Sequence, residues 1–155
     1  SGIFTTVRKI ETDGGKEVEE VFAPQAAVLH LEDDVDVSRG DIIVLHKDVP
    51  QIAQELEVLL CWMDKKPLIS GNKYLLQINS TRVRSIVKDI EYRLDVNSLE
   101  RKYSPDQVEL NDIVKATIKT AQPVVFDKYN DLRANGGAIL IDETSNVTVG
   151  ACMIQ

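Results

Sequence analysis

The chain contains few of the residues that characterise specialised classes of protein. Only two cysteines, Cys61 and Cys152, occur among 155 residues, so neither a disulfide scaffold nor a structural zinc site is expected. No apolar run approaches the roughly 20 residues that a membrane helix needs, and the first residues lack the features of a secretion signal. Both cysteines lie in apolar runs, as buried thiols do. These absences predict a cytoplasmic protein with no membrane partner.

Positive charge is also scarce. The formal net charge is −7, and residues 1–47 carry 10 acidic against 5 basic side chains. Nucleic-acid binding draws much of its affinity from neutralised phosphates, so we expect no nucleic-acid partner. Arg82, Arg84 and Lys88 form a small local cluster, which we interpret as a solvated face of a strand.

Motifs for catalysis and for cofactors are missing as well. No Gly-x-x-x-x-Gly-Lys-[Ser/Thr] loop is present to hold phosphates, and Asn72-Lys73 lacks the aspartate that completes a guanine-binding motif. His30 and His46 are isolated, and the acidic run at residues 32–36 lacks the ligand spacing of a calcium loop. We therefore expect no catalytic, cofactor-binding or metal-ligating residue in this chain.

The chain does contain enough apolar residues, 43%, to build a core, and their pattern is that of strands. Short apolar segments bounded by turn residues recur roughly every 8–12 residues, which is typical of an all-β sandwich or barrel. Pro50 restricts Val49 to extended geometry and marks a break. We place a domain boundary at Asp48, between residues 1–47 and 48–155.

Several segments are predicted as strands. About six of them follow residue 50, which is the number that a small closed barrel needs. Thr81–Val96 fits a helical stripe or a strand, and its β-branched residues favour the strand; residues 95–105 are expected to form a loop. The remaining predicted strands are 6–10, 26–31, 42–45, 56–62, 74–78 and 113–119, with a final hairpin after Gly137 and Asn146.

The strand that ends at Trp62 is apolar on both faces. Leu60 and Trp62 lie on one face, whereas Leu59, Cys61 and Met63 lie on the other. Only one face of a barrel strand points inward. The second face is therefore either covered by a neighbouring domain or subunit, or sandwiched within its own domain.

The last 30 residues carry the most distinctive order of residues. Phe126-Asp127-Lys128-Tyr129 is followed by Arg133, by Gly136-Gly137, by Ile141-Asp142, and by Asn146-Val147-Thr148-Val149-Gly150-Ala151-Cys152-Met153. This order resembles the C-terminal barrel of the GTPase subunit of bacterial sulfate adenylyltransferase. Earlier segments, such as Trp62-Met63-Asp64, are similar to that family as well. Asn135 and Cys152 depart from it, because the family usually has Thr and Gly there.

The resemblance implies an all-β fold of translation-factor-like barrels, similar to elongation factor Tu. Residues 1–47 would be the second half of the domain 2 barrel, and residues 48–155 the complete six-stranded domain 3 barrel. It also implies a non-catalytic, C-terminal fragment of an enzyme that makes adenylyl sulfate and pyrophosphate from ATP and sulfate, driven by GTP hydrolysis. GTP and Mg²⁺ would bind a preceding domain, and this fragment alone is expected to be inactive.

Such a fragment would serve docking. We expect Trp62, Met63 and Arg133 to contact either its own GTPase domain or the catalytic adenylyltransferase subunit, since Trp and Arg are favoured interface residues. The alternative for Trp62 is a place in the barrel core. A half barrel exposes unpaired strand edges, so residues 1–47 are expected to self-associate with another chain or to pack back on the second barrel.

Two other functions fit the sequence less closely. One is a pair of tRNA-binding barrels from a translation elongation factor, against which the charge of −7 argues; salt-dependent RNA binding would identify it. The other is a free-standing β-barrel adaptor without an enzymatic parent. A P-loop encoded upstream of Ser1 would exclude that adaptor.

Overall fold

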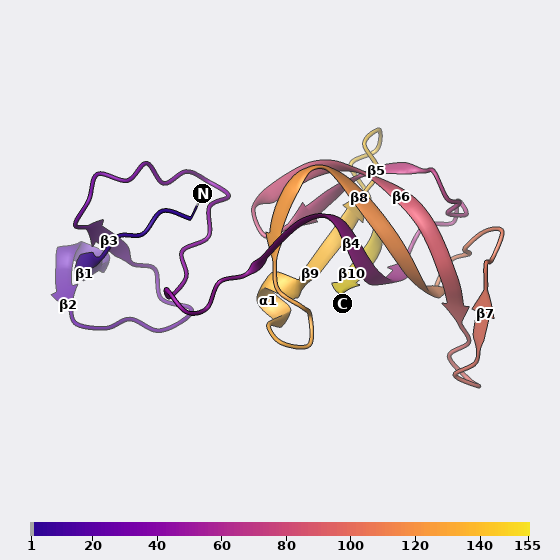
Figure 1. Cartoon of the computed structure of the whole chain (residues 1–155), viewed down its shortest axis with the longest axis horizontal. Coiled ribbons are helices and arrows are strands. Elements are labelled where there is room, and N and C mark those ends of the chain that lie inside the picture. Colours follow the sequence, from indigo (N-terminus) through magenta and orange to yellow (C-terminus); the bar gives the residue numbers. More distant parts are fainter. Residues whose placement is uncertain (1) are drawn as a thin grey trace. The chain divides into compact units, whose positions relative to one another are not determined.

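The computed structural model describes residues 2–155 (Figure 1). It divides into two compact units, which meet in sequence between Asp41 and Ile42. The domain boundary at Asp48 stays a prediction. Among the residues described, no helix is long and apolar enough to cross a membrane.

The first unit is a small antiparallel sheet. Its strands are β1 (Val7–Thr12), β2 (Lys16–Val18) and β3 (Val28–Leu31), in the order β2-β1-β3. The short helix η1 (Asp13–Gly15) joins β1 to β2, and both of its glycines adopt the left-handed backbone that such a tight reversal favours. Of the residues described up to Asp41, none is buried.

One predicted strand in this part of the chain is wrong. Residues 42–45 are apolar and mostly β-branched, yet they form no strand in the described structure. Strand preference reflects how well a side chain packs on a pleated surface, rather than a property of the backbone alone. Ile43 and Leu45 are exposed, so this run lacks the packing that would order a ladder.

The second unit is a closed barrel of six antiparallel strands, which confirms the predicted fold (Figure 1). Around the ring, the order is β5-β9-β10-β4-β8-β6, and the pairing of β5 with β6 closes it. The strands are β4 (Gln51–Trp62), β5 (Lys73–Ile78), β6 (Thr81–Leu94), β8 (Ile113–Phe126), β9 (Gly137–Ile141) and β10 (Thr148–Ile154).

Two further elements are attached to the ring. The strand β7 (Arg101–Tyr103) pairs with the end of β6 and projects from the barrel (Figure 1), so the loop predicted at residues 95–105 contains a short strand. The single-turn helix α1 (Arg133–Gly136) leads into β9. The segment 81–96 fitted a helix or a strand by its sequence; it forms the strand β6 over Thr81–Leu94, as its β-branched residues favour.

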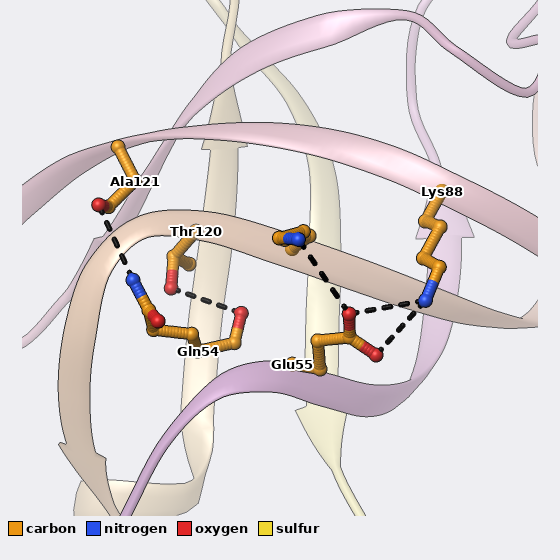
Figure 2. A network of polar contacts seen from close by, with 6 residues as sticks. Gln54, Glu55, Lys88, Thr120 and Ala121 are labelled. Atoms are coloured by element: carbon orange, nitrogen blue, oxygen red, sulfur yellow. Dashed lines mark hydrogen bonds and ion pairs between the residues drawn. The ribbon is translucent and has the colours of Figure 1, made fainter.

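Long strands bend around this narrow barrel at a break in register. The pairing of β4 with β8 shifts between Ala53 and Glu55, and such irregularities increase the local bend and twist of a strand. Side chains lie against the backbone groups there: the Thr120 hydroxyl is 2.7 Å from the carbonyl of Gln122 and 3.2 Å from that of Gln54, and the side-chain amide of Gln54 donates to the carbonyl of Ala121 at 3.3 Å (Figure 2). The bend is therefore stabilised by local hydrogen bonds.

The barrel interior holds one continuous apolar core. Alternate residues of each strand point inward, as the period of two requires, and the ring of Trp62 meets that of Tyr74 edge-on, with centroids 5.6 Å apart. Burial raises the pKa of Tyr74 to about 12. The largest fully buried side chains are Trp62, Leu56, Leu60, Leu68, Leu76, Ile118, Leu140 and Ile154.

Candidate docking surface

The strand β4 separates two apolar rows, as its sequence predicts. Leu60 and Trp62 face the core and are fully buried, whereas Leu59 and Cys61 point outward and are only partly buried. Met63 continues the outward row beyond the end of β4 and is 51% exposed. Within residues 2–155, nothing therefore covers this row completely.

Neighbouring strands extend the outward row sideways. Residues that are paired across an antiparallel ladder point to the same side of the sheet. Met153 of β10 pairs with Leu59, and Ala151 pairs both with Cys61 and with Ile139 of β9. These positions are apolar, whereas on its other side Leu59 pairs with Lys115 of β8. We call this surface the apolar outer face, and it consists of Leu59, Cys61, Met63, Ile113, Ile139, Ala151 and Met153.

The adjoining part of the barrel exterior is charged and pairs with itself. Glu55 of β4 lies 3.0 Å from the ammonium group of Lys88 on β6 (Figure 2), and Lys115 of β8 lies 2.9 Å from Glu91 and 3.3 Å from Glu57. Hydrogen bonds to Glu91 and Glu57 raise the pKa of Lys115. These charged side chains pair with one another in solvent. Unlike the apolar outer face, this region therefore has its partners within the chain.

The three predicted interface residues occupy different environments. Trp62 is 1% exposed and lies in the core, which was the alternative that its sequence left open. Its indole nitrogen donates to the carbonyl of Lys66 at 2.9 Å, and the amide of Met63 donates to the carbonyl of Val149 at 2.8 Å. Trp62 thus holds the turn that carries Met63, so any influence on a partner would be exerted through that turn.

Arg133 lies at the opposite end of the same face. It belongs to α1, and its guanidinium carbon is 5.8 Å from the centre of the Tyr129 ring. The same ring would be 3.7 Å from a Cβ atom at Gly137, which pairs with Met153 of the apolar outer face. Tyr129 and Arg133 therefore border that face. Over the described residues 2–155, no carboxylate forms an ion pair with Arg133.

A buried polar network fixes the loop that carries Arg133. Asn135 is only 7% exposed; it accepts a hydrogen bond from Asn79 at 2.6 Å and donates one to Asp127 at 2.7 Å. Gly136 adds a second restraint, because a Cβ atom there would overlap the backbone of Tyr129. The sequence identified Asn135 and Tyr129 only as part of a motif, since nothing local reveals that Asn79 reaches Asn135.

Cys152, the other departure from the motif, is a core residue. It lies in β10 between Leu60 and Ala138 on the neighbouring strands, and burial raises the pKa of its thiol to about 12. A thiol in that position behaves as a small apolar side chain. In the part of the chain that is described, no group of three His, Cys, Asp or Glu side chains is placed to hold a metal ion.

Comparisons with known proteins agree with this architecture. A relative from Teredinibacter turnerae, sulfate adenylyltransferase subunit 1, is 41% identical over 153 residues, which are 99% of this chain and 32% of that protein. The bifunctional enzyme CysN/CysC of Mycobacterium tuberculosis is 36% identical over 154 residues, 99% of this chain and 25% of that one. This chain thus matches about a third or less of the length of these relatives.

Solved structures support the fold independently. The crystal structure of Sup35 complexed with GDP superposes with a TM-score of 0.82 at 16% identity, over 97% of this chain and 37% of that one. At such low identity, the similarity concerns the fold alone. The family model described as GTP-eEF1A C-terminal domain-like matches residues 55–155. Since that match covers the whole barrel except the first four residues of β4, the chain belongs to the GTP-eEF1A C-terminal domain-like family.

Proposed function

We propose that this chain is the non-catalytic barrel part of the GTPase subunit of a sulfate adenylyltransferase. The observation that carries the proposal is the 41% identity to sulfate adenylyltransferase subunit 1 along 99% of the chain. The full enzyme would join ATP and sulfate into adenylyl sulfate and pyrophosphate, with GTP hydrolysis driving that reaction. GTP and Mg²⁺ would bind a different domain of such a subunit, since this sequence has no P-loop.

In this proposal, the barrel serves as a rigid framework for docking. A GTPase transmits the state of its nucleotide through contacts that differ between two arrangements of neighbouring parts. A closed barrel with a continuous core is suited to hold such contacts in fixed positions. Met63 and Arg133 would touch either the GTP-binding domain or the catalytic subunit, and Trp62 would position Met63 from inside the barrel.

The N-terminal sheet would contribute a second kind of contact. Its described residues bury no core, and Phe22 and Val28 are exposed. We propose that these strands are covered by further protein, either strands of another chain or another surface of the same one. Sedimentation of the isolated chain at increasing concentration would show whether copies of it associate.

A binding measurement tests the main proposal. The 155-residue chain is titrated, by calorimetry, with the purified catalytic subunit of a sulfate adenylyltransferase, with the separate GTP-binding domain, and with tRNA. Binding to either protein supports the docking role, whereas salt-dependent binding to tRNA alone supports an elongation-factor role instead. The chain by itself should neither hydrolyse GTP nor form adenylyl sulfate, and either activity would contradict a purely docking role.

A further inference from the structure

Asn135 has a neighbour in the chain that the other asparagines lack. It is followed by Gly136, whereas each of the other six asparagines precedes a residue with a side chain. Asparagine is thermally labile, because the backbone nitrogen of the next residue can attack its side-chain carbon. Glycine favours this attack, since it has no Cβ atom in the way and its backbone turns freely.

We propose that Asn135-Gly136 is a site of spontaneous deamidation, which the buried polar network keeps closed until the surrounding loop opens. In this reaction the Gly136 nitrogen bonds to Cγ of Asn135, the bond from Cγ to Nδ2 breaks, and ammonia leaves with the proton of the Gly136 amide. Water then opens the resulting succinimide ring at either carbonyl, which leaves aspartate or isoaspartate. No reactant other than water is needed.

The closed structure protects Asn135 in two ways. Both ends of its side-chain amide are held, because Oδ1 accepts a hydrogen bond from Asn79 at 2.6 Å and Nδ2 donates one to Asp127 at 2.7 Å. Its backbone is held as well: Asn135 lies in α1, and its carbonyl accepts from the amide of Asp127 at 3.2 Å. Ring closure requires both groups to leave these positions, so the closed loop is unreactive.

The segment around Asn135 is suited to local opening. We call residues 127–136 the α1 loop. Its helix is a single turn, and residues 130–134 are exposed. Short exposed elements open at a lower free energy than strands that line a core. The rate of deamidation is then the rate in an unfolded chain multiplied by the fraction of time for which the α1 loop is open.

The products prevent the loop from closing as before. A carboxylate at position 135 cannot donate to Asp127, and it places a second negative charge beside that side chain in a position that is only 7% exposed. Isoaspartate in addition lengthens the backbone of α1 by one methylene group. Since the same loop carries Tyr129 and Arg133, one reaction converts a transient opening into a lasting change of that surface.

Peptide mass spectrometry of the full chain, incubated at neutral pH, tests the lock. Asn135 should convert about a hundredfold more slowly in the folded chain than in urea. Asn79→Ala removes one hydrogen bond of the lock and should accelerate conversion in the folded chain by about fivefold, without changing the rate in urea. Asn72→Ala is the matched control, because Asn72 accepts a hydrogen bond from Ile69 in a different turn; it should leave the rate at Asn135 unchanged. Equal rates in the folded chain and in urea, or in Asn79→Ala and Asn72→Ala, overturn the inference.

Two substitutions of Asn135 test the consequence. Asn135→Asp reproduces one product and should lower the melting temperature at neutral pH by about 5 °C or more. This loss should shrink in acid, because proximity to a second carboxylate raises the pKa of one member of the pair and protonation then relieves the repulsion. Asn135→Thr retains a hydroxyl that can accept from Asn79 and donate to Asp127, so it should melt within about 2 °C of the unsubstituted chain and form no product. An Asn135→Asp chain as stable as the unsubstituted one at neutral pH overturns the inference.

Discussion

The N-terminal sheet and the barrel are built from the same kind of strand, but only the barrel encloses a core. No residue described up to Asp41 is buried, whereas Leu60, Leu140 and Val114 of the barrel have no exposed surface at all. Three short strands leave two faces and two edges open, while six strands that close on themselves create an interior. The comparison shows that strand-forming residues do not suffice: burial depends on closure of the sheet.

Glycine substitutions should give the largest difference between the two regions. Gly136→Ala should destabilise the barrel by about 3 kcal/mol or more, because the new Cβ would overlap the backbone of Tyr129 and strain the chain where it enters β9. Gly14→Ala in the N-terminal sheet meets no atom within 4 Å and should cost only about 1–2 kcal/mol for its left-handed backbone. Urea unfolding monitored by circular dichroism measures the loss in free energy of unfolding for both variants. Equal losses would contradict the difference between the two regions.

Two valines provide a matched test of burial. Val114→Ala removes two methyl groups from a fully buried position in β8 and should cost about 2 kcal/mol. Val28→Ala in β3 changes a side chain that is 56% exposed, so we expect a change within about 0.5 kcal/mol. The shift in the urea midpoint measures the stability change of each variant. A cost for Val28→Ala as large as that for Val114→Ala would mean that the N-terminal sheet hides a core of its own.

The two cysteines sharpen the comparison within the barrel, between its inner and outer sides. Cys152 faces the core, and burial raises the pKa of its thiol to about 12; Cys61 is partly exposed on the apolar outer face. Only a thiolate reacts readily, so a thiol reagent at neutral pH should modify Cys61 first. Cys152 should react only on the time scale of unfolding. Mass spectrometry of the labelled peptides reports both rates, and rapid labelling of Cys152 would contradict a closed core.

The smallest expected effect is on acid stability. Backbone and hydroxyl hydrogen bonds from Ser145, and the amide of Thr144, lower the pKa of Asp142 in the turn between β9 and β10. A carboxylate whose pKa is lowered by folding stabilises the fold at pH values above its ordinary pKa of 3.8. This contribution disappears as the pH falls through the lowered pKa.

Asp142→Asn should therefore lower the urea midpoint at neutral pH and converge with the unsubstituted chain in acid. Because Asp142 belongs to the barrel, its loss should leave hydrogen exchange of β1 and β3 unchanged. A difference between the two chains that persists undiminished below the lowered pKa would exclude the carboxylate charge as its cause.

Much of the barrel could be predicted because its signals are local. Alternation along β4, the Gly136-Gly137 pair and the turn residues after Asp142, and β-branched residues in β6 all favoured the strands that are found. The apolar run at residues 42–45 gave the same local signal and forms no strand. Local pattern describes what a segment prefers, whereas a ladder also requires a neighbour to pair with.

The candidate docking surface was predictable only in part. The sequence placed Met63 on one of two apolar rows and singled out Arg133 in a motif. It could not separate the two roles open to Trp62, because a strand that is apolar on both sides does not say which side faces inward. It also gave no indication that Asn79 restrains Asn135 over a separation of 56 residues.

The sequence by itself determined the β-rich class, the alternation of inner and outer rows, and the motif that defines the family, because each depends on residues close together in the chain. Only the tertiary structure decided which row of β4 became core, and that Met63 and Arg133 border one common face. Those outcomes depend on ring closure and cross-strand register, which bring together residues from β4, β9 and β10 that no local pattern connects.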